Sequence, residues 1–326
     1  MASSLILDHA SPPGFCAVFG PQSHRVCSAL VHVQIPNVSG QTGTTRMDTK
    51  LGLISVLVAI IGWGSYFVPM KRIQKYDPYF FQFVMCIAIF VSSVLVSFFS
   101  KNIVYSYFGI LSGILWATGN LLSIFAVQNS GLSKAAPLWM GGAIFISFIW
   151  GLFFFKEDLN PCLALVGVVV LVLGIFLISL INEDEGKSNF KGIICAIISG
   201  VFFGSQLVPL KMSGLEPMKF LFSMSLGIMV AGMMIYLVKR KSFEVQIFVP
   251  AIISGCLWNV ANLASFFAVF NLGISVGYPL TQMALFVSLL WGIIYFKEIT
   301  ETRKIALLTY GAIILFIGSI ILTFSR

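Results

Sequence analysis

The chain has 326 residues, of which 58% are hydrophobic and only 10% are charged, and its mean hydropathy is +0.97. A soluble domain is roughly 45–50% apolar and about 25% charged. This composition therefore excludes an ordinary soluble protein and indicates a chain surrounded mainly by lipid. Lys and Arg outnumber Asp and Glu by 20 to 12. Because these cations lie in short clusters between apolar runs, they are typical of residues that orient membrane helices and do not indicate nucleic-acid binding.

Residues 1–46 differ in composition from the rest of the chain. They hold all three histidines, are rich in Ser, Pro and Gly, and contain one acidic residue, Asp8. We interpret this segment as a disordered N-terminal leader. It is either a targeting sequence or the product of an early start, with Met47 as the true initiator. It is given no part in the mechanism.

Ten apolar stretches follow, each near the roughly 20 residues that a membrane-spanning helix needs. A charged linker at residues 182–188 separates the first five from the last five. We therefore predict an all-α, multi-pass membrane protein of ten transmembrane helices, most simply in the cell membrane, with one five-helix unit over residues 47–185 and another over 186–326. The predicted spans lie near residues 51–70, 78–99, 103–127, 133–155, 160–181, 190–210, 217–238, 246–270, 274–296 and 303–324.

The two five-helix units are related by an internal repeat. Residues 116–138 return as residues 258–280 with 12 of 23 positions identical, including Trp, Asn, Ser and Pro in register. The sequence around Pro69 returns around Pro209, and the sequence around Trp150 returns around Trp291. An odd number of spans in each unit requires the second unit to enter the membrane inverted relative to the first. Inverted repeats are a recurring plan of secondary transporters, whose solute site lies near mid-membrane where the repeats meet.

The first and sixth predicted spans each contain a proline four residues after a serine. Proline cannot donate to the carbonyl group four residues back, so the carbonyl groups of Ser65 and Ser205 must find other partners. We interpret these elements as hinges, and the two serines as candidate solute contacts. A plain kink satisfied by a neighbouring helix is the alternative. The predicted hinge residues are Gly64, Pro69, Gly204 and Pro209.

A polar and aromatic stripe follows one face of the third span and recurs on the eighth. Its members lie at positions i, i+4 and i+7 and therefore share a helix face. An indole beside a carboxamide suits a sugar ring, which has apolar C–H surfaces and hydroxyl groups. The alternative is that the Asn residues bind helices together, since an unpaired amide is costly in lipid. The stripe comprises Trp116, Asn120 and Ser123 and their counterparts Trp258, Asn262 and Ser265.

The two repeats differ at three candidate positions, where the second carries more hydrogen-bonding groups. Gln206 stands where the first repeat has Tyr66, and Tyr278 and Gln282 stand where it has Ala136 and Met140. We expect Gln206, Tyr278 and Gln282 to contact the solute and to set its orientation.

Acidic residues avoid the middle of every predicted span. Proton-driven carriers normally keep a titratable group inside the membrane, so this pattern favours a neutral, hydroxyl-rich solute. Glu157 and Glu298 lie at span ends directly after a Lys, where an end-of-helix ion pair with a nearby cation is the preferred interpretation. No catalytic group, metal site or cofactor motif is recognised, so we predict no enzyme activity, no metal and no cofactor.

Two stretches carry a resemblance to a known family: residues 63–71 (WGSYFVPMK) and residues 119–137 (GNLLSIFAVQNSGLSKAAP). With the ten-span repeat, they resemble the EamA-like drug/metabolite transporter superfamily, and within it the glucose/ribose porter branch of sugar uptake proteins. The resemblance implies that spans one to four and six to nine enclose a central cavity. It therefore places six of the candidates on cavity-forming helices: Ser65, Trp116, Asn120, Ser205, Trp258 and Asn262.

The sequence thus predicts a multi-pass transporter of a small neutral solute, most simply a monosaccharide, working by alternating access. An exporter of amino acids or other metabolites, and a non-transporting membrane sensor or assembly protein, are the alternatives. The expected partners are the solute and the bilayer, and association into a homodimer is left open.

Overall fold

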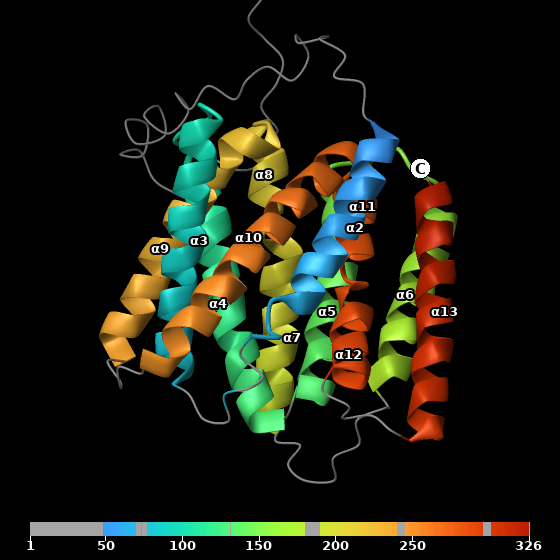
Figure 1. Ribbon diagram of the computed structural model, residues 1–326. Helices are drawn as coiled ribbons and strands as arrows, with labels where there is room; N and C mark the ends of the chain where they lie inside the picture. Colours follow the sequence, from blue (N-terminus) through green and yellow to red (C-terminus); the bar gives the residue numbers. More distant parts are fainter. Residues whose placement is uncertain are drawn as a thin grey trace, which may run out of the picture. The chain divides into compact units, whose positions relative to one another are not determined.

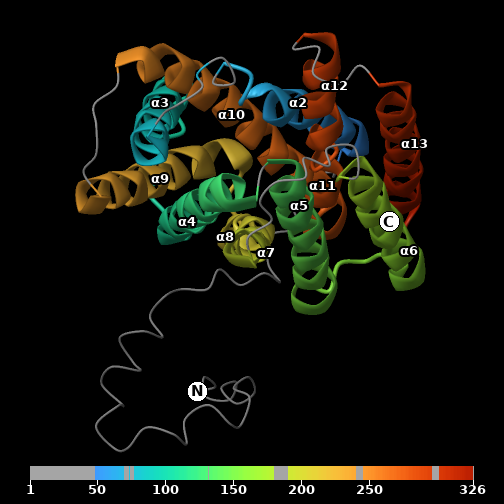
Figure 2. The same ribbon diagram turned by 90° about the horizontal axis from the view of Figure 1, so that it is seen from below.

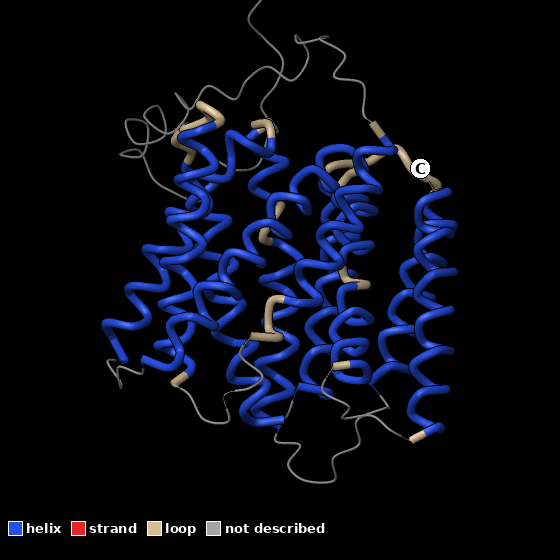
Figure 3. The backbone as a smooth tube through the Cα atoms, in the orientation of Figure 1, coloured by secondary structure: helices blue, strands red, loops and turns tan. Residues whose placement is uncertain are grey.

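The computed structural model describes residues 48–69, 73, 77–130, 132–179, 190–239, 245–295 and 301–325. The predicted leader, residues 1–46, and the predicted boundary between residues 185 and 186 lie outside these ranges. Within them, all regular structure is helical (Figure 3). The prediction of an all-α protein is confirmed.

Helices occupy all ten predicted spans (Figure 1). The helices of the first five spans are α2 (Thr49–Ser65), α3 (Pro78–Phe99), α4 (Tyr107–Ser130), α5 (Leu132–Ile149) with its π-helical extension η2 (Trp150–Phe154), and α6 (Pro161–Ser179). Those of the last five are α7 (Phe190–Ser205) with α8 (Val208–Ser213), α9 (Pro217–Lys239), α10 (Val245–Leu272), α11 (Ile274–Thr281) with α12 (Ala284–Ile294), and α13 (Thr302–Phe324).

The composition of these helices is that of membrane spans. Among the described residues, six helices are long and apolar enough to cross a bilayer, and three further apolar helices are shorter. Large apolar side chains cover the outside of the bundle: Phe99, Val238 and Phe324 are 78%, 79% and 76% exposed. Such a surface is unstable in water and suits the hydrocarbon of a bilayer. The chain is an integral, multi-pass membrane protein.

Two spans predicted to be continuous helices are broken just before their prolines. The first ends as a helix at Ser65, and Tyr66–Pro69 form turns. The sixth breaks at Gln206 and Leu207 and resumes as α8, with Pro209 in its first turn. Proline fits there because the first helical N–H groups have no intrahelical partner. Each proline thus follows a helix break and does not kink a continuous helix, and the hinge role of these elements stays a prediction.

Helices from the two predicted halves pack against one another in matched pairs. α2 packs on α10 and α12, while the corresponding contacts of α7 are with α4 and α5. α4 of the first half packs on α9 of the second, and its equivalent α10 packs on α3, the equivalent of α9. α6 and α13 lie side by side at one edge of the bundle (Figures 1 and 2).

Glycines at repeated positions allow the same close approaches in both halves. A Cβ atom added at Gly64 would lie 2.8 Å from the carbonyl oxygen of Ala284, and one at Gly204 would lie 2.8 Å from that of Ala143. Ala143 and Ala284 are displaced by 141 residues, the displacement that also relates Trp150 to Trp291. Small residues that bring backbones together are typical of helix packing in membranes, where lipid is as apolar as leucine.

Candidate solute site

Two tryptophans of the repeated stripe meet inside the bundle. The rings of Trp116, on α4, and Trp258, on α10, have centroids 4.2 Å apart at an interplanar angle of 45°. Both belong to one apolar cluster, and they are only 2% and 3% exposed. The stripe therefore brings one indole from each half into direct contact, and the seam between them is closed in this conformation.

Each tryptophan is followed one helical turn later by a buried asparagine, Asn120 or Asn262, which are 2% and 1% exposed. Asn262 Nδ2 donates a weak hydrogen bond to Met224 Sδ at 3.7 Å, but its Oδ1 has no partner. Asn120 Nδ2 has none either. A buried polar atom without a partner costs about 1–3 kcal/mol. These two amides therefore keep unused hydrogen-bonding capacity beside the indole pair.

The remaining stripe residues, Ser123 and Ser265, bond to their own helices. Ser123 Oγ donates to the carbonyl oxygen of Asn120 at 2.8 Å, and Ser265 Oγ donates to that of Asn262 at 2.7 Å. Both hydroxyl protons are thus occupied within α4 and α10, although each oxygen can still accept a hydrogen bond.

The three residues peculiar to the second repeat lie near one another. Gln206 Nε2 donates to Tyr278 Oη at 3.0 Å, and Gln282 Nε2 donates to Thr281 Oγ1 at 3.3 Å. Gln206 Oε1 is buried and has no partner. The bond from Gln206 to Tyr278 joins the break between α7 and α8 to α11.

The two serines of the proline elements accept hydrogen bonds from tryptophans of neighbouring helices. Trp291 Nε1 donates to Ser65 Oγ at 2.8 Å, and Trp150 Nε1 donates to Ser205 Oγ at 3.0 Å. The carbonyl oxygen of Ser65 accepts from the backbone N–H of Val68 at 3.0 Å. In this conformation Ser65 and Ser205 hold helices together.

Two further buried polar groups belong to this region and were not among the sequence candidates. Gln82, on α3, donates from Nε2 to the carbonyl oxygen of Ala117 at 3.1 Å and leaves Oε1 without a partner. Trp63, on α2, packs edge-on against Tyr278 with centroids 6.1 Å apart, and its Nε1 has no partner. The second repeat has neither residue: Leu221 stands near the position equivalent to Gln82, and Phe203 stands near that equivalent to Trp63. Gln82 could have been selected from the sequence, because it is a carboxamide within an otherwise apolar span.

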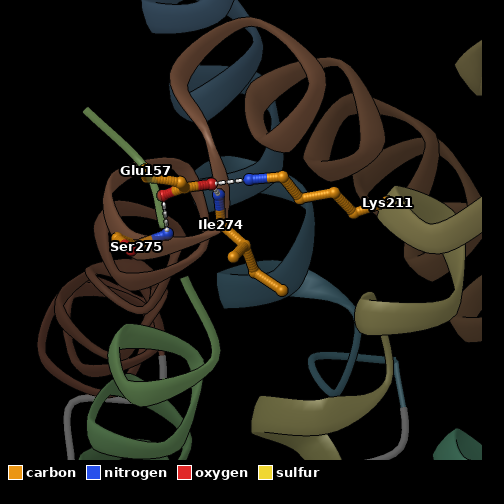
Figure 4. Close-up of polar contacts among 4 residues, drawn as sticks. All are labelled: Glu157, Lys211, Ile274 and Ser275. Carbon is orange, nitrogen blue, oxygen red and sulfur yellow. Dashed lines mark hydrogen bonds and ion pairs between the residues drawn. The ribbon is translucent and has the colours of Figure 1, made fainter. Parts of the chain in front are cut away.

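A partly buried ion pair lies where η2, α8 and α11 meet (Figure 4). The carboxylate of Glu157 binds Lys211 Nζ and accepts from the backbone N–H groups of Ile274, at 2.7 Å, and Ser275, at 2.9 Å. Lys211 Nζ also lies 4.5 Å from the centroid of the Phe155 ring. The predicted ion pair of Glu157 is confirmed, but its partner lies 54 residues away. Glu298 lies outside the described residues.

The surroundings of Glu157 shift its pKa in opposite directions. Burial raises the pKa of this carboxyl, while the charge of Lys211, its hydrogen bond and the backbone N–H of Ser275 lower it. The lowering prevails, so the pKa of Glu157 lies below its ordinary value. The carboxylate is therefore ionised at neutral pH.

A cavity of about 470 Å³ is lined by the start of α3, the C-terminal half of α4 and the end of α9. Its lining is almost entirely apolar, with Lys239 at one side. Tyr79 and Lys239 alone supply side-chain hydrogen-bonding groups to this lining, so the cavity offers few partners to a hydroxylated solute. The residues that line it are Tyr79, Leu121, Phe125, Met234, Ile235, Val238 and Lys239.

Residues 47–325 match the protein family described as "Sugar transport protein". The chain belongs to this family. Among its curated relatives, Transmembrane protein 144 homolog A of Dictyostelium discoideum is 25% identical, over 84% of this chain and 98% of that protein. The glucose uptake protein GlcU of Bacillus subtilis is 24% identical, over 86% of this chain and 99% of its own length.

A solved structure has the same fold. It is titled only "Crystal structure of protein", superposes with a TM-score of 0.66 and is 13% identical in sequence. The match covers 83% of this chain and 98% of the other. At this identity the likeness concerns the fold alone.

Proposed function

We propose that this member of the sugar transport family, a membrane sugar transporter, carries a neutral monosaccharide by alternating access through the seam between α4 and α10. The observation that carries this proposal is the pair Trp116 and Trp258, each followed by an asparagine with unused hydrogen-bonding capacity. An indole face packs on the C–H surface of a sugar ring, and a carboxamide both donates to and accepts from hydroxyl groups. Glucose is the first solute to test, because related bacterial proteins are named glucose uptake proteins.

The repeat supports an inverted arrangement of the two halves, as in the drug/metabolite transporter superfamily. α2 begins at the end of the bundle where α8 follows the end of α7, so the two equivalent helices run in opposite directions (Figure 1). The bonds from Trp150 to Ser205 and from Trp291 to Ser65 are the same contact made twice. An inverted pair of units gives the protein two related but opposite conformations.

Unequal burial of equivalent elements supports alternating access. Gln206–Pro209 are buried, whereas their counterparts Tyr66–Pro69 are only half-buried. Two copies of one element in different environments are expected when one end of a pathway is closed more tightly than the other. In the opposite conformation the two elements would exchange environments.

Counterflow in proteoliposomes tests the proposed function. Labelled glucose, rhamnose, ribose and amino acids are offered one at a time to vesicles preloaded with the same unlabelled compound, with protein-free vesicles as the control. We expect saturable, protein-dependent exchange of at least one sugar. Exchange of amino acids without exchange of sugar would favour the metabolite exporter, and no exchange at all would favour the sensor or assembly protein. Homodimer formation stays a prediction, which light scattering of the purified protein checks.

A further inference from the structure

Five buried amide and indole atoms have no hydrogen-bond partner in the part of the chain that the structure describes. They come from Trp63, Gln82, Asn120, Gln206 and Asn262, on or next to helices of both halves. Native structures contain only a few such atoms per 100 residues, and each calls for an explanation. Here two are donors, Trp63 Nε1 and Asn120 Nδ2, and three are acceptors, the side-chain oxygens of the other residues.

The helix α4 brings these groups together. Gln82 binds the carbonyl group of Ala117, the residue after Trp116. Ser112, one turn before Trp116, donates from Oγ to the carbonyl oxygen of Gln206. Gln206 in turn binds Tyr278, against which Trp63 packs. Asn120 and Asn262 follow the two indoles by one helical turn. The contacts just described link Gln82, Gln206 and Trp63 to the same part of α4.

We propose that Gln82 and Trp63 are sugar-binding residues, and that each bonds a separate hydroxyl group of the solute. This inference rests on the proposed function and extends it to α2 and α3. A sugar hydroxyl donates one hydrogen bond and accepts others, so a mixture of free donors and acceptors matches a polyol. An ionised solute would need a charged partner, and none of these five groups carries charge.

Transport kinetics with deoxyglucoses test the role of Gln82. The wild type and Gln82→Met, which keeps the length of the side chain and removes its amide, are compared with glucose and with 2-, 3-, 4- and 6-deoxyglucose. We expect the variant to raise KM for glucose about tenfold, the effect of one hydrogen bond to a neutral group. We also expect it to lose the discrimination against one of the four analogues, because a site that bonds a hydroxyl rejects the analogue lacking it. Trp63→Phe should lose discrimination against a different analogue.

Ser97→Ala is the matched control for this experiment. Ser97 lies on the same helix, is fully buried, and also has an unpartnered polar atom, but it is 15 residues from Gln82, or roughly 22 Å along an α-helix. We expect its analogue profile to equal that of the wild type. Unchanged discrimination in both Gln82→Met and Trp63→Phe would overturn this proposal alone. A wild type that exchanges none of the sugars would overturn the proposed function as well.

A second observation, independent of the unpartnered atoms, concerns the ion pair of Glu157 and Lys211. We propose that it is a latch that holds the α8–α11 end of the solute pathway closed and must break before that end opens. The carboxylate lies on the loop after η2, and it ties that loop to Lys211 on α8 and to the first residues of α11. One side chain thus joins three separate elements.

The start of α11 has a backbone conformation that lets the Glu157 carboxylate approach closely. Gly273, the N-cap of α11, has a φ angle of +77°, a conformation that favours glycine. A Cβ atom at that position would lie 2.7 Å from Glu157 Oε1. The first N–H groups of a helix lack intrahelical partners and favour an anion, so the start of α11 supplies hydrogen bonds that a carboxylate satisfies.

The latch lies next to the proposed solute site. Lys211 follows Gln206 by five residues, and Tyr278 follows Ile274 by four. The latch and the bond from Gln206 to Tyr278 therefore both connect the α8 region to α11, at two successive positions along these elements. Both ties must yield before α8 and α11 can separate. A solute that bonded Gln206 in place of Tyr278 would release the inner tie and leave the latch as the outer one.

Chemical labelling tests the latch without reference to any sugar. A cysteine is placed at Leu207 or at Val276, each 1% exposed and close to the ion pair in the chain. The rate of reaction with a membrane-impermeant thiol reagent is then measured in proteoliposomes, after subtraction of the rate without the added cysteine. We expect Glu157→Gln and Lys211→Met each to raise the rate about tenfold, because each breaks a partly buried ion pair that joins the loop after η2 to α8.

Lys219→Gln is the matched control for the latch, because it removes the exposed ion pair of Lys219 with Glu216 beyond the end of α8, at 3.1 Å. We expect no change in its labelling rate. Thermal unfolding in detergent verifies that each variant is folded. Rates equal to the wild type in folded Glu157→Gln and Lys211→Met would overturn the latch and leave the proposed function standing. An equal increase in Lys219→Gln would also overturn it.

Discussion

Trp150 donates its indole N–H to Ser205 Oγ at 3.0 Å, and the equivalent Trp291 donates to Ser65 Oγ at 2.8 Å. The same contact thus joins the fourth span to the sixth and the ninth to the first. Each serine lies at the break that precedes a proline, so these bonds fix the helix ends on either side of the proposed solute pathway.

A double-mutant cycle measures the strength of this contact. Trp150→Phe, Ser205→Ala and the double variant are compared by thermal unfolding in detergent, and Trp291→Phe with Ser65→Ala provides the second cycle. We expect a coupling energy of about 0.6 kcal/mol in each, the average for hydrogen bonds between membrane helices. A coupling near zero in both cycles would show that the indoles contribute by packing alone.

Replacing the two asparagines separates solute binding from helix packing. We expect Asn120→Leu and Asn262→Leu to abolish saturable sugar exchange, because each removes a carboxamide with unused hydrogen-bonding capacity. We also expect thermal stability to stay the same or to rise, because an unsatisfied buried group is removed. Unchanged exchange with lowered stability would assign both residues to helix packing.

Glycine at position 113 is required by the close approach of α4 and α9. An added Cβ atom there would overlap the carbonyl oxygen of Met224, so we expect Gly113→Ala to lower the thermal stability of the purified protein. Gly141 is the matched control, because the nearest atom to its added Cβ lies at an ordinary 3.9 Å. Gly141→Ala should be neutral or stabilising, since Ala has the higher helix propensity. Equal effects of the two substitutions would contradict this account of the packing.

Acidic pH should weaken the closure at α8. The pKa of Glu157 lies below its ordinary value of 4.5 because of Lys211 and the N–H of Ser275, although burial opposes this. A lowered pKa in the closed conformation stabilises that conformation above pH 4.5, and the stabilisation disappears as the pH falls through the lowered pKa. The adjoining charges of Lys156 and Asp158 are exposed to solvent.

Labelling of Leu207→Cys as a function of pH checks this expectation. A reagent whose own reactivity is calibrated against a free thiol is used between pH 7 and pH 4. The corrected rate should stay constant above pH 4.5 and rise below it, while Glu157→Gln should give a high rate at every pH. A corrected wild-type rate that falls as the pH is lowered would have the wrong sign for this mechanism.

The sequence by itself determined the class of protein, the ten helical spans and the repeat. These follow from local properties: a run of apolar residues near the length of a bilayer must form a helix, because backbone groups have no water to bond in lipid. The stripe from Trp116 to Ser123 was also readable, since helical periodicity places its members on one face. The contact between Trp116 and Trp258 could not be read from either stripe alone, because it also requires the two stripes to face each other.

Only the tertiary structure decided which groups pair across the bundle. Glu157 has Lys156 beside it in sequence but binds Lys211 and the start of α11, because the ends of the fourth, sixth and ninth spans converge there. Likewise, an apolar span does not reveal that Gln82 and Trp63 each keep a buried polar atom without a partner. Hydropathy and periodicity are properties of one segment, whereas the satisfaction of a buried polar atom depends on which distant segment packs against it.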